Sequence, residues 1–149
     1  MTGKQLSKIG SKLATYLKEE FLDRNIKVAI AFRGLSGTSI ASVVLSETHK
    51  LGGEIGSFYV RKKDEKSHGI KVEWGLPWLP EETETIIIVD DYVESGDTVK
   101  EIYQRILGQV PLLSKGQLSW GLCMVDTFEP DLEYPNFDAR FMKYNINIT

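Results

Sequence analysis

Apolar residues recur at helical spacing in three parts of the chain. Near its start, this spacing predicts an amphipathic helix with a buried face made of Leu6, Ile9, Leu13, Leu17 and Phe21. The same pattern predicts a second helix with Ile40, Val43 and Val44 on one face, and a third over residues 98–107. Gly52 and Gly53 are expected to end the second helix.

Short apolar runs lie between these helices and predict strands. Residues 27–32 (KVAIAF) and 85–90 (TIIIVD) are nearly continuous apolar runs, as expected for strands covered on both faces of a sheet. Further strands are expected at 55–61, 118–125 and 137–144, whereas 71–84 predicts an irregular segment with room for one short strand. Strand-turn-helix units in series predict an α/β fold with an open, mostly parallel sheet flanked by helices.

Composition narrows the class of protein. A chain of 149 residues with 42% hydrophobic residues fits one domain with one core. The net charge of -3 gives no basic excess for nucleic acid, and no apolar run approaches the roughly 18 residues of a membrane span. The single cysteine, Cys123, lies in an apolar run and is expected in the core. The polar N-terminus lacks the apolar segment of a signal peptide, so we expect a cytoplasmic protein.

One apolar run delivers two adjacent carboxylates, Asp90 and Asp91, to a turn of small residues that leads into the third helix. A helix N-terminus offers unpaired N–H groups and the positive end of the helix dipole, both of which suit a phosphate. The hydroxyls of Ser95 and Thr98 would add donors, and Gly96 would let the backbone approach closely. The carboxylates suit ribose hydroxyls, or Mg²⁺ through its water shell.

Other proteins with acids at a strand end fit less well. A Walker B strand needs a GxxxxGK[ST] partner, which the chain lacks. Phosphatases of the haloacid dehalogenase type need DxDx[TV], which residues 90–93 do not supply, and a receiver domain would carry its acidic pair early in the chain. Strand-acid-turn-helix also occurs in α/β proteins without a ligand, but the added Ser-Gly-x-Thr turn favours a phosphate site.

Two more loops follow predicted strands. Residues 33–37 (RGLSG) are expected to break the chain, and Arg33 could meet a diphosphate. The nearby hydroxyls could instead cap the second helix. Residues 61–69 (RKKDEKSHG) crowd basic groups into one polar loop, which is typical of a solvated face or of an anion site. In a parallel sheet these loops would meet at the carboxyl ends of the strands, where ligands bind.

The segment 86–98 (IIIVDDYVESGDT) resembles the phosphoribosyl pyrophosphate (PRPP) motif of type I phosphoribosyltransferases. That motif has four apolar residues, two acids, two apolar residues and a small Thr/Ser/Gly turn. The resemblance implies that PRPP is bound by Asp90, Asp91, Tyr92, Val93, Glu94, Ser95, Gly96, Asp97 and Thr98. It also implies Mg²⁺ at Asp90 and Asp91, mostly through water or ribose hydroxyls.

Two positions depart from this motif. Tyr92 is bulky where an aliphatic residue is normal, and Glu94 stands where Ala, Thr or Asp is usual. In the hypoxanthine-guanine branch the second position is an Asp proposed as general base, so Glu94 would keep a carboxylate for that role.

The other two loops extend the resemblance. The family's pyrophosphate loop, often with a strained or cis peptide, follows the first strand, and its place is taken by Arg33, Gly34, Leu35 and Ser36. Residues 61–69 resemble the mobile catalytic loop of orotate phosphoribosyltransferases, RKxxKxHG, through Arg61, Lys62, Lys66 and His68. One additional residue separates Lys62 from Lys66 here, so the loop supports the family more than it supports orotate as substrate.

The resemblance implies a function. It points to Mg²⁺-dependent transfer of the 5-phosphoribosyl group from PRPP to a nitrogenous base, with release of pyrophosphate, by a homodimer. The core would span about 27–125, and 126–149, rich in aromatic residues, would be a small hood over the acceptor. Trp74 and Trp78 could instead cover the site or face a partner subunit. The sequence does not identify the acceptor. It leaves open a non-catalytic regulator that binds PRPP or a nucleotide, and a stand-alone subunit or viral-type homologue that has lost activity, to which Tyr92 and Glu94 would point.

Overall fold

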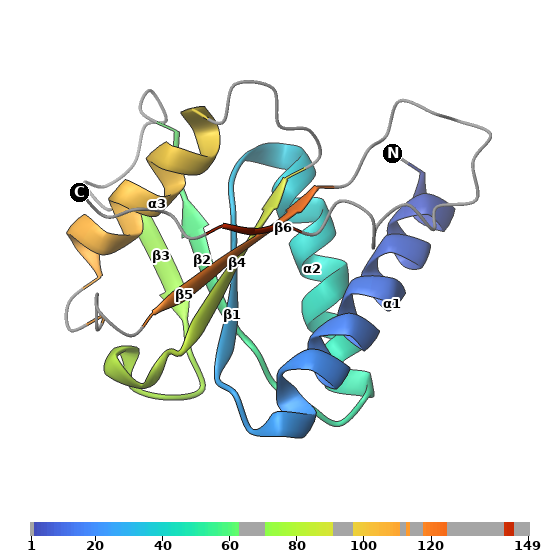
Figure 1. Ribbon diagram of the computed structural model, residues 1–149. Helices are drawn as coiled ribbons and strands as arrows, with labels where there is room; N and C mark the ends of the chain where they lie inside the picture. Colours follow the sequence, from blue (N-terminus) through green and yellow to red (C-terminus); the bar gives the residue numbers. More distant parts are fainter. Residues whose placement is uncertain are drawn as a thin grey trace.

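One sheet, with helices on both of its faces, organises the part of the chain that the structure describes (Figure 1). This computed structural model describes residues 2–62, 71–90, 97–110, 113, 118–124 and 142–144. The helices are α1 (Gly3–Glu20), α2 (Gly34–Lys50) and α3 (Asp97–Gln109), with short 3-10 turns η1 (Leu22–Arg24) and η2 (Pro80–Glu82). The strands are β1 (Val28–Phe32), β2 (Gly56–Val60), β3 (Val72–Gly75), β4 (Thr85–Asp90), β5 (Ser119–Met124) and β6 (Met142–Tyr144).

The strand order is β3-β2-β1-β4-β5-β6. The four central strands, β2, β1, β4 and β5, are parallel, and the edge strands β3 and β6 are antiparallel to their neighbours. The predicted open, mostly parallel α/β sheet is therefore confirmed. The segment 71–84 does hold one short strand, β3, and a 3-10 turn. Of the strand expected at 137–144, the described part is β6.

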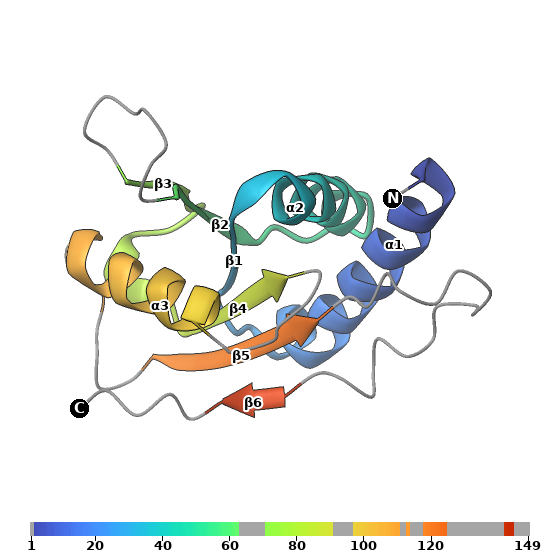
Figure 2. The same ribbon diagram turned by 90° about the horizontal axis from the view of Figure 1, so that it is seen from above.

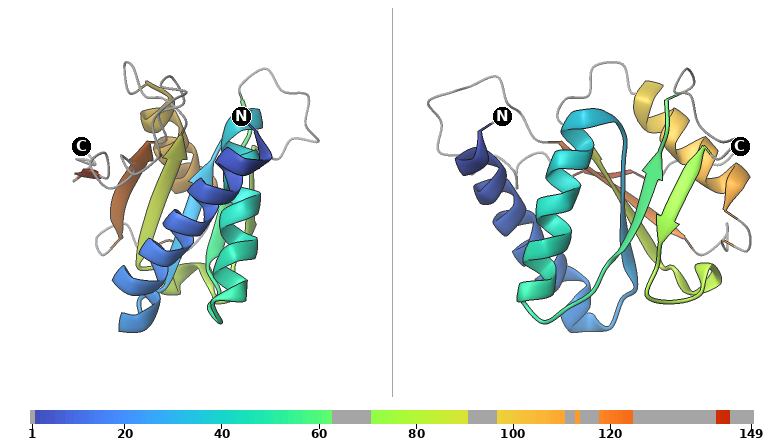
Figure 3. Two further views of the ribbon diagram at one scale, coloured as in Figure 1. Left: turned by 90° about the vertical axis from the view of Figure 1, so that its right-hand side faces the viewer. Right: turned by 180° about the vertical axis from the view of Figure 1, so that it is seen from behind.

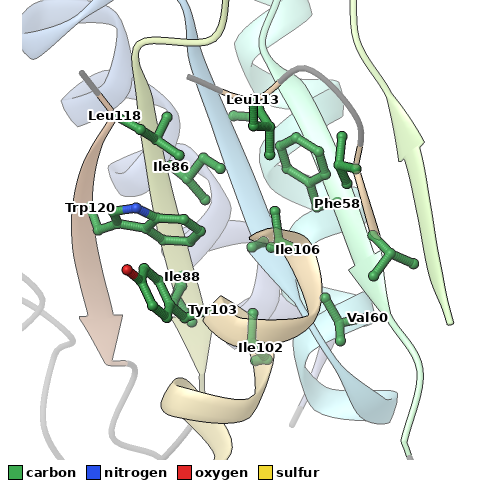
Figure 4. Packing of buried hydrophobic residues seen from close by; sticks show 14 of the residues in the cluster. Phe58, Val60, Ile86, Ile88, Ile102, Tyr103, Ile106, Leu113, Leu118 and Trp120 are labelled. Atoms are coloured by element: carbon green, nitrogen blue, oxygen red, sulfur yellow. The ribbon is translucent and has the colours of Figure 1, made fainter. Parts of the chain in front are cut away.

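The helices cover the two faces of the sheet, as Figure 2 shows. On one face α1 and α2 pack together and cover a cluster that includes Leu13, Leu17, Ile30, Ile40 and Ile87. On the other face α3 covers Phe58, Ile86, Ile88, Trp120 and Leu122, with Ile102 and Ile106 of α3 among them (Figure 4). β1 and β4 are buried on both faces, which explains their continuous apolar sequences.

Particular residues set the start of α1 and its packing on α2. Thr2 and Gln5 form a reciprocal capping box at the start of α1. Gly10 lets α1 approach α2 closely, because a Cβ atom built there would lie 2.2 Å from Cγ1 of Val43. No described helix is long and apolar enough to cross a membrane.

One local prediction was wrong. Residues 33–37 were expected to break the chain, but α2 begins at Gly34 and runs through them. Gly34 has a φ of 71°, which an L side chain rarely adopts, so the change of direction is completed within one residue. The change of direction expected over residues 33–37 is thus made at the first residue of the helix alone.

Candidate functional site

The strand order reverses between β1 and β4, which defines the crevice where ligands bind in open α/β sheets. β1 continues into α2 on one face, and α3, which follows β4 in the chain, covers the other face. Both helices begin at the edge where β1, β2 and β4 end, as the right-hand view of Figure 3 shows. The helix dipoles of α2 and α3 therefore point their positive ends at this edge.

The first turn of α2 lies directly beside the end of β4. A Cβ atom built on Gly37 would be 3.4 Å from Cβ of Phe32 and 3.7 Å from the carbonyl oxygen of Val89. Val89 precedes Asp90, whose side chain is half-buried at the end of the strand. The glycine thus allows the start of α2, the end of β1 and the first predicted PRPP-binding carboxylate to come together.

Arg33, between the end of β1 and the start of α2, is bound by a residue that the sequence did not indicate. Its Nη1 donates to Oε2 of Glu101 at 2.9 Å, and its Nη2 donates to Oε1 at 3.2 Å. Glu101 lies in α3, so this pair joins the first strand to the helix after the PRPP-like segment. The Arg33 side chain is 9% exposed. Its Nε is buried and finds no hydrogen-bond acceptor among the described residues.

A second arginine shares this carboxylate. Nη2 of Arg105 lies 2.8 Å from Oε1 of Glu101, and its Nη1 donates to the carbonyl oxygen of Arg61. Arg105 is 13% exposed, whereas Glu101 is 37% exposed. Glu101 and Arg105 are four positions apart on one helix, and this spacing of opposite charges predicts their ion pair. Nothing in the sequence indicated that Arg33, 68 positions away, would join them.

The second predicted loop begins beside the first. Lys62 lies over Gly34, since a Cβ atom built on this glycine would be 3.5 Å from Cε and 3.7 Å from Nζ of the lysine. Its neighbour Arg61 pairs with Glu73 of β3 and lies 5.6 Å above the ring of Tyr59. Of the predicted catalytic residues, the structure therefore brings Arg61 and Lys62 to the same edge as Arg33.

Other predicted site residues lie in the first turns of α2 and α3 or outside the described part of the chain. Ser36 and Leu35 belong to the first turn of α2, and Leu35 is 86% exposed. The hydroxyls of Thr38 and Ser39 donate to the carbonyl oxygens four residues earlier, so they do not cap the helix. Asp97 and Thr98 are exposed in the first turn of α3. The remaining predicted residues lie outside the described part of the chain: Lys66, His68, Asp91, Tyr92, Val93, Glu94, Ser95 and Gly96.

The tryptophans do not both lie near this edge. Trp78 packs against Gly56, at the opposite end of β2, and donates to the Thr83 hydroxyl at 2.9 Å. It therefore does not cover the carboxyl ends of the strands. Trp74 pairs with Phe58 in the edge strand and is 43% exposed.

Charged side chains of both signs line the described part of this edge. Its cations include Arg33, Arg61, Lys62 and Arg105, and its carboxylates include Glu73, Asp90, Asp97 and Glu101. Within the described ranges, no three His, Cys, Asp or Glu side chains form a group that could enclose a metal ion. The arrangement suits an anion that brings its own ligands for a cation, such as a diphosphate with Mg²⁺.

Solved structures with this fold are found among the phosphoribosyltransferases. Orotate phosphoribosyltransferase of Francisella tularensis is 16% identical, with a TM-score of 0.51 over 71% of this chain and 46% of that chain. Hypoxanthine phosphoribosyltransferase of Trypanosoma cruzi, in complex with the product IMP, is 10% identical, with a TM-score of 0.51 over 78% of this chain and 64% of that one. The hypoxanthine-guanine enzyme of L. donovani is 14% identical, with a TM-score of 0.53 over 83% and 73%.

This likeness is one of structure. No model of a protein family matches the sequence, and no curated protein matches it either. The chain spans less than half the length of the orotate enzyme that it matches. The fold expected from segment 86–98 is nevertheless confirmed: the chain has the fold of the type I phosphoribosyltransferases.

Proposed function

We propose that this protein is a Mg²⁺-dependent phosphoribosyltransferase that moves the 5-phosphoribosyl group of PRPP to a nitrogenous base. The observation that carries the proposal is the meeting of Arg33, Lys62 and Asp90 at the switch point of a phosphoribosyltransferase fold. These three residues come from the three segments in which the sequence resembles that family.

The reaction requires positive groups that neutralise the pyrophosphate end of PRPP. A ring nitrogen of the base forms a bond to C1 of the ribose, and the bond from C1 to the pyrophosphate oxygen breaks, its electron pair leaving with pyrophosphate. Positive charge builds on the sugar in such glycosyl transfers, and negative charge builds on the leaving group. Arg33 and Lys62 would bind the pyrophosphate, helped by the N-terminus of α2. Lys66 and His68 would act on the same group, with His68 giving it a proton or hydrogen bond.

The carboxylates would act at the other end. Asp90 and Asp91 would accept hydrogen bonds from the ribose hydroxyls. Glu94 would take the proton that the base loses, and the turn through Thr98 would hold the 5-phosphate at the start of α3. Closure of the 61–69 loop would keep water from the reacting carbon.

Magnesium fits the donors at this edge. Mg²⁺ in phosphate sites keeps several waters and takes one or two protein carboxylates together with substrate phosphates. Asp90, half-buried at a strand end, is such a carboxylate, and the described residues offer no larger cluster that would demand another metal. Asp90 and Asp91 would hold the ion, mostly through water or ribose hydroxyls, and the ion would supply positive charge for the pyrophosphate.

Titration calorimetry with PRPP, with and without Mg²⁺, tests the proposal first. Purine and pyrimidine bases are then added singly and pyrophosphate release is measured. We expect Mg²⁺-dependent PRPP binding and release with one base, which also identifies the acceptor. Lys66→Ala and Asp91→Asn should reduce turnover far more than Lys50→Ala, a control at an exposed ion pair with Glu47.

Two other results would count against the proposal. Binding of PRPP without release from any base would favour a regulator that senses PRPP or a nucleoside monophosphate. Absence of binding to PRPP and to nucleoside monophosphates would show that segment 86–98 is no phosphate site.

A further inference from the structure

The Glu101 carboxylate occupies the position that an anion would take between two arginines whose side chains are largely buried. Both terminal nitrogens of Arg33 contact it, and Nη2 of Arg105 contacts one of the same oxygens. Carboxylates and phosphates bind the guanidinium fork in the same bidentate manner. The geometry around Glu101 is therefore that of an occupied phosphate site, with the anion supplied by the protein itself.

The three side chains differ in their freedom to move. Arg33 and Arg105 are 9% and 13% exposed, while Glu101 is 37% exposed on the surface of α3. Arg105 is also tied to the backbone of Arg61, and Arg33 extends directly from the end of β1. Glu101 is the most exposed of the three, so its carboxylate can rotate into solvent when another anion takes its place at the arginines, whereas the arginines cannot leave without losing their packing.

The charges also leave room for a stronger anion. Among the described residues, the Glu101 carboxylate contacts both guanidinium groups, and the buried Nε of Arg33 has no hydrogen-bond acceptor there. Lys62 lies nearby, over Gly34. A multiply charged anion at this position would neutralise more of this charge than a single carboxylate does.

We propose that Glu101 is a built-in competitor for the pyrophosphate end of the substrate. It holds Arg33 and Arg105 in place while the site is empty, and it gives up Arg33 when a diphosphate binds. Glu101 thereby sets the affinity for the anion without touching the reacting carbon. This inference rests on the proposed function, because it assumes that Arg33 binds the pyrophosphate group.

Calorimetric titration with inorganic pyrophosphate, at fixed Mg²⁺ and ionic strength, tests the competition. Glu101→Gln keeps the shape of the side chain and removes its charge, so pyrophosphate should bind about tenfold more tightly, equivalent to ~1.4 kcal/mol. Glu82→Gln is the matched control. Glu82 is 40% exposed, pairs with Lys27 at 3.0 Å and lies in η2 before β4, away from the site. It changes the net charge equally and should leave the affinity unchanged.

Thermal unfolding gives a second readout. Glu101→Gln should lower the melting temperature, because two arginines lose a charged partner. Pyrophosphate should then raise the melting temperature of this variant by more than it raises that of the wild type. Glu101→Asp keeps the charge but is too short to reach both arginines, and it serves if the glutamine variant does not fold. We expect this variant also to bind pyrophosphate more tightly than the wild type.

The outcomes separate this inference from the proposed function. If the wild type binds PRPP but Glu101→Gln binds pyrophosphate equally or more weakly, Glu101 only positions Arg33 and the competition is refuted. If neither the folded wild type nor the variant binds pyrophosphate, Arg33 is no anion ligand and the inference is also refuted. Failure of the wild type to bind PRPP, measured in the same series, would refute the proposed function itself.

Discussion

The guanidinium of Arg33 is bound through both terminal nitrogens to the carboxylate of Glu101, at 2.9 and 3.2 Å. The pair connects the end of β1 to α3 across the edge where β1 and β4 diverge. An arginine held in this way presents a fixed set of donors, which a flexible lysine would not. The geometry of the described site therefore depends on one side chain from each of two distant segments.

Replacement of Arg33 by lysine should weaken PRPP binding although the charge is kept. Lysine offers a point charge and cannot bind a diphosphate or Glu101 bidentately, so we expect a loss of about tenfold in affinity, or ~1.4 kcal/mol. Arg24→Lys is the control, because Arg24 is exposed and makes one long contact of 3.8 Å with Glu20. Calorimetric titration with PRPP compares the two. Equal affinities in both variants would remove Arg33 from the binding site.

Gly34→Ala should affect both stability and binding. Its φ of 71° is strained for alanine, at a cost of about 1–2 kcal/mol, and the new methyl group would contact Lys62. Gly52→Ala is matched, since Gly52 has a φ of 87° and open space around it. Urea unfolding should show similar losses for the two variants, whereas only Gly34→Ala should weaken PRPP binding. Weaker binding in both would mean that the effect is one of global stability.

Much of the fold could be predicted from local patterns. Residues 28–32 and 85–89 are buried on both faces of a sheet, so the apolar character of these runs identified β1 and β4 directly. Parallel strands place their carboxyl ends at one edge, and this rule predicted that Arg33, Lys62 and Asp90 would meet there. The start of α2 was misplaced because residues 33–37 were expected to break the chain, whereas the helix begins at Gly34, which has a positive φ.

The site was predictable only in part, because its ion pairs are not local. The spacing of Glu101 and Arg105 indicates a pair on one helix, but the contact of Arg33 with Glu101 spans 68 positions. It depends on which face of the sheet α3 covers, which no single segment encodes. The predicted roles of Lys66, His68 and Glu94 stay predictions, since these residues lie outside the described part of the chain.

Close packing of α1 on α2 should make Gly10 intolerant of a methyl group. Alanine would gain up to about 1 kcal/mol of helix propensity, but its Cβ would lie 2.2 Å from Cγ1 of Val43 and 3.4 Å from that residue's backbone carbonyl carbon. We therefore expect net destabilisation of about 1–3 kcal/mol by urea unfolding. Gly108→Ala in α3, with nothing within 4 Å, should instead be neutral or stabilising. The double variant Gly10→Ala, Val43→Ala should recover part of the loss.

Cys123 should make stability depend on alkaline pH. Burial raises the pKa of its thiol well above the ordinary value of 9.0, so the folded protein retains the proton where the unfolded chain loses it. The stability that the protonated thiol contributes is fully present below pH 9. As the pH rises from there toward the pKa of the folded state, the free energy of unfolding falls by up to ~1.36 kcal/mol per pH unit. Urea unfolding between pH 8 and 10 should show a steeper decline for the wild type than for Cys123→Ala. Parallel declines would show that the thiol is accessible to solvent in the folded protein.

Asp90→Asn should separate the role of charge from that of shape at the end of β4. The amide keeps the size of the side chain but donates hydrogen bonds through one arm and cannot attract Mg²⁺, so we expect PRPP affinity to fall about tenfold or more in the presence of the ion. Because the variant loses the charge attraction to Mg²⁺, the difference in PRPP affinity between the variant and the wild type should become smaller when Mg²⁺ is omitted. Asp23→Asn makes the same chemical change at an exposed ion pair with Lys18 and should bind PRPP normally. A Mg²⁺-independent loss in Asp90→Asn would instead assign Asp90 to the ribose hydroxyls alone, and an unchanged affinity would exclude it from the site.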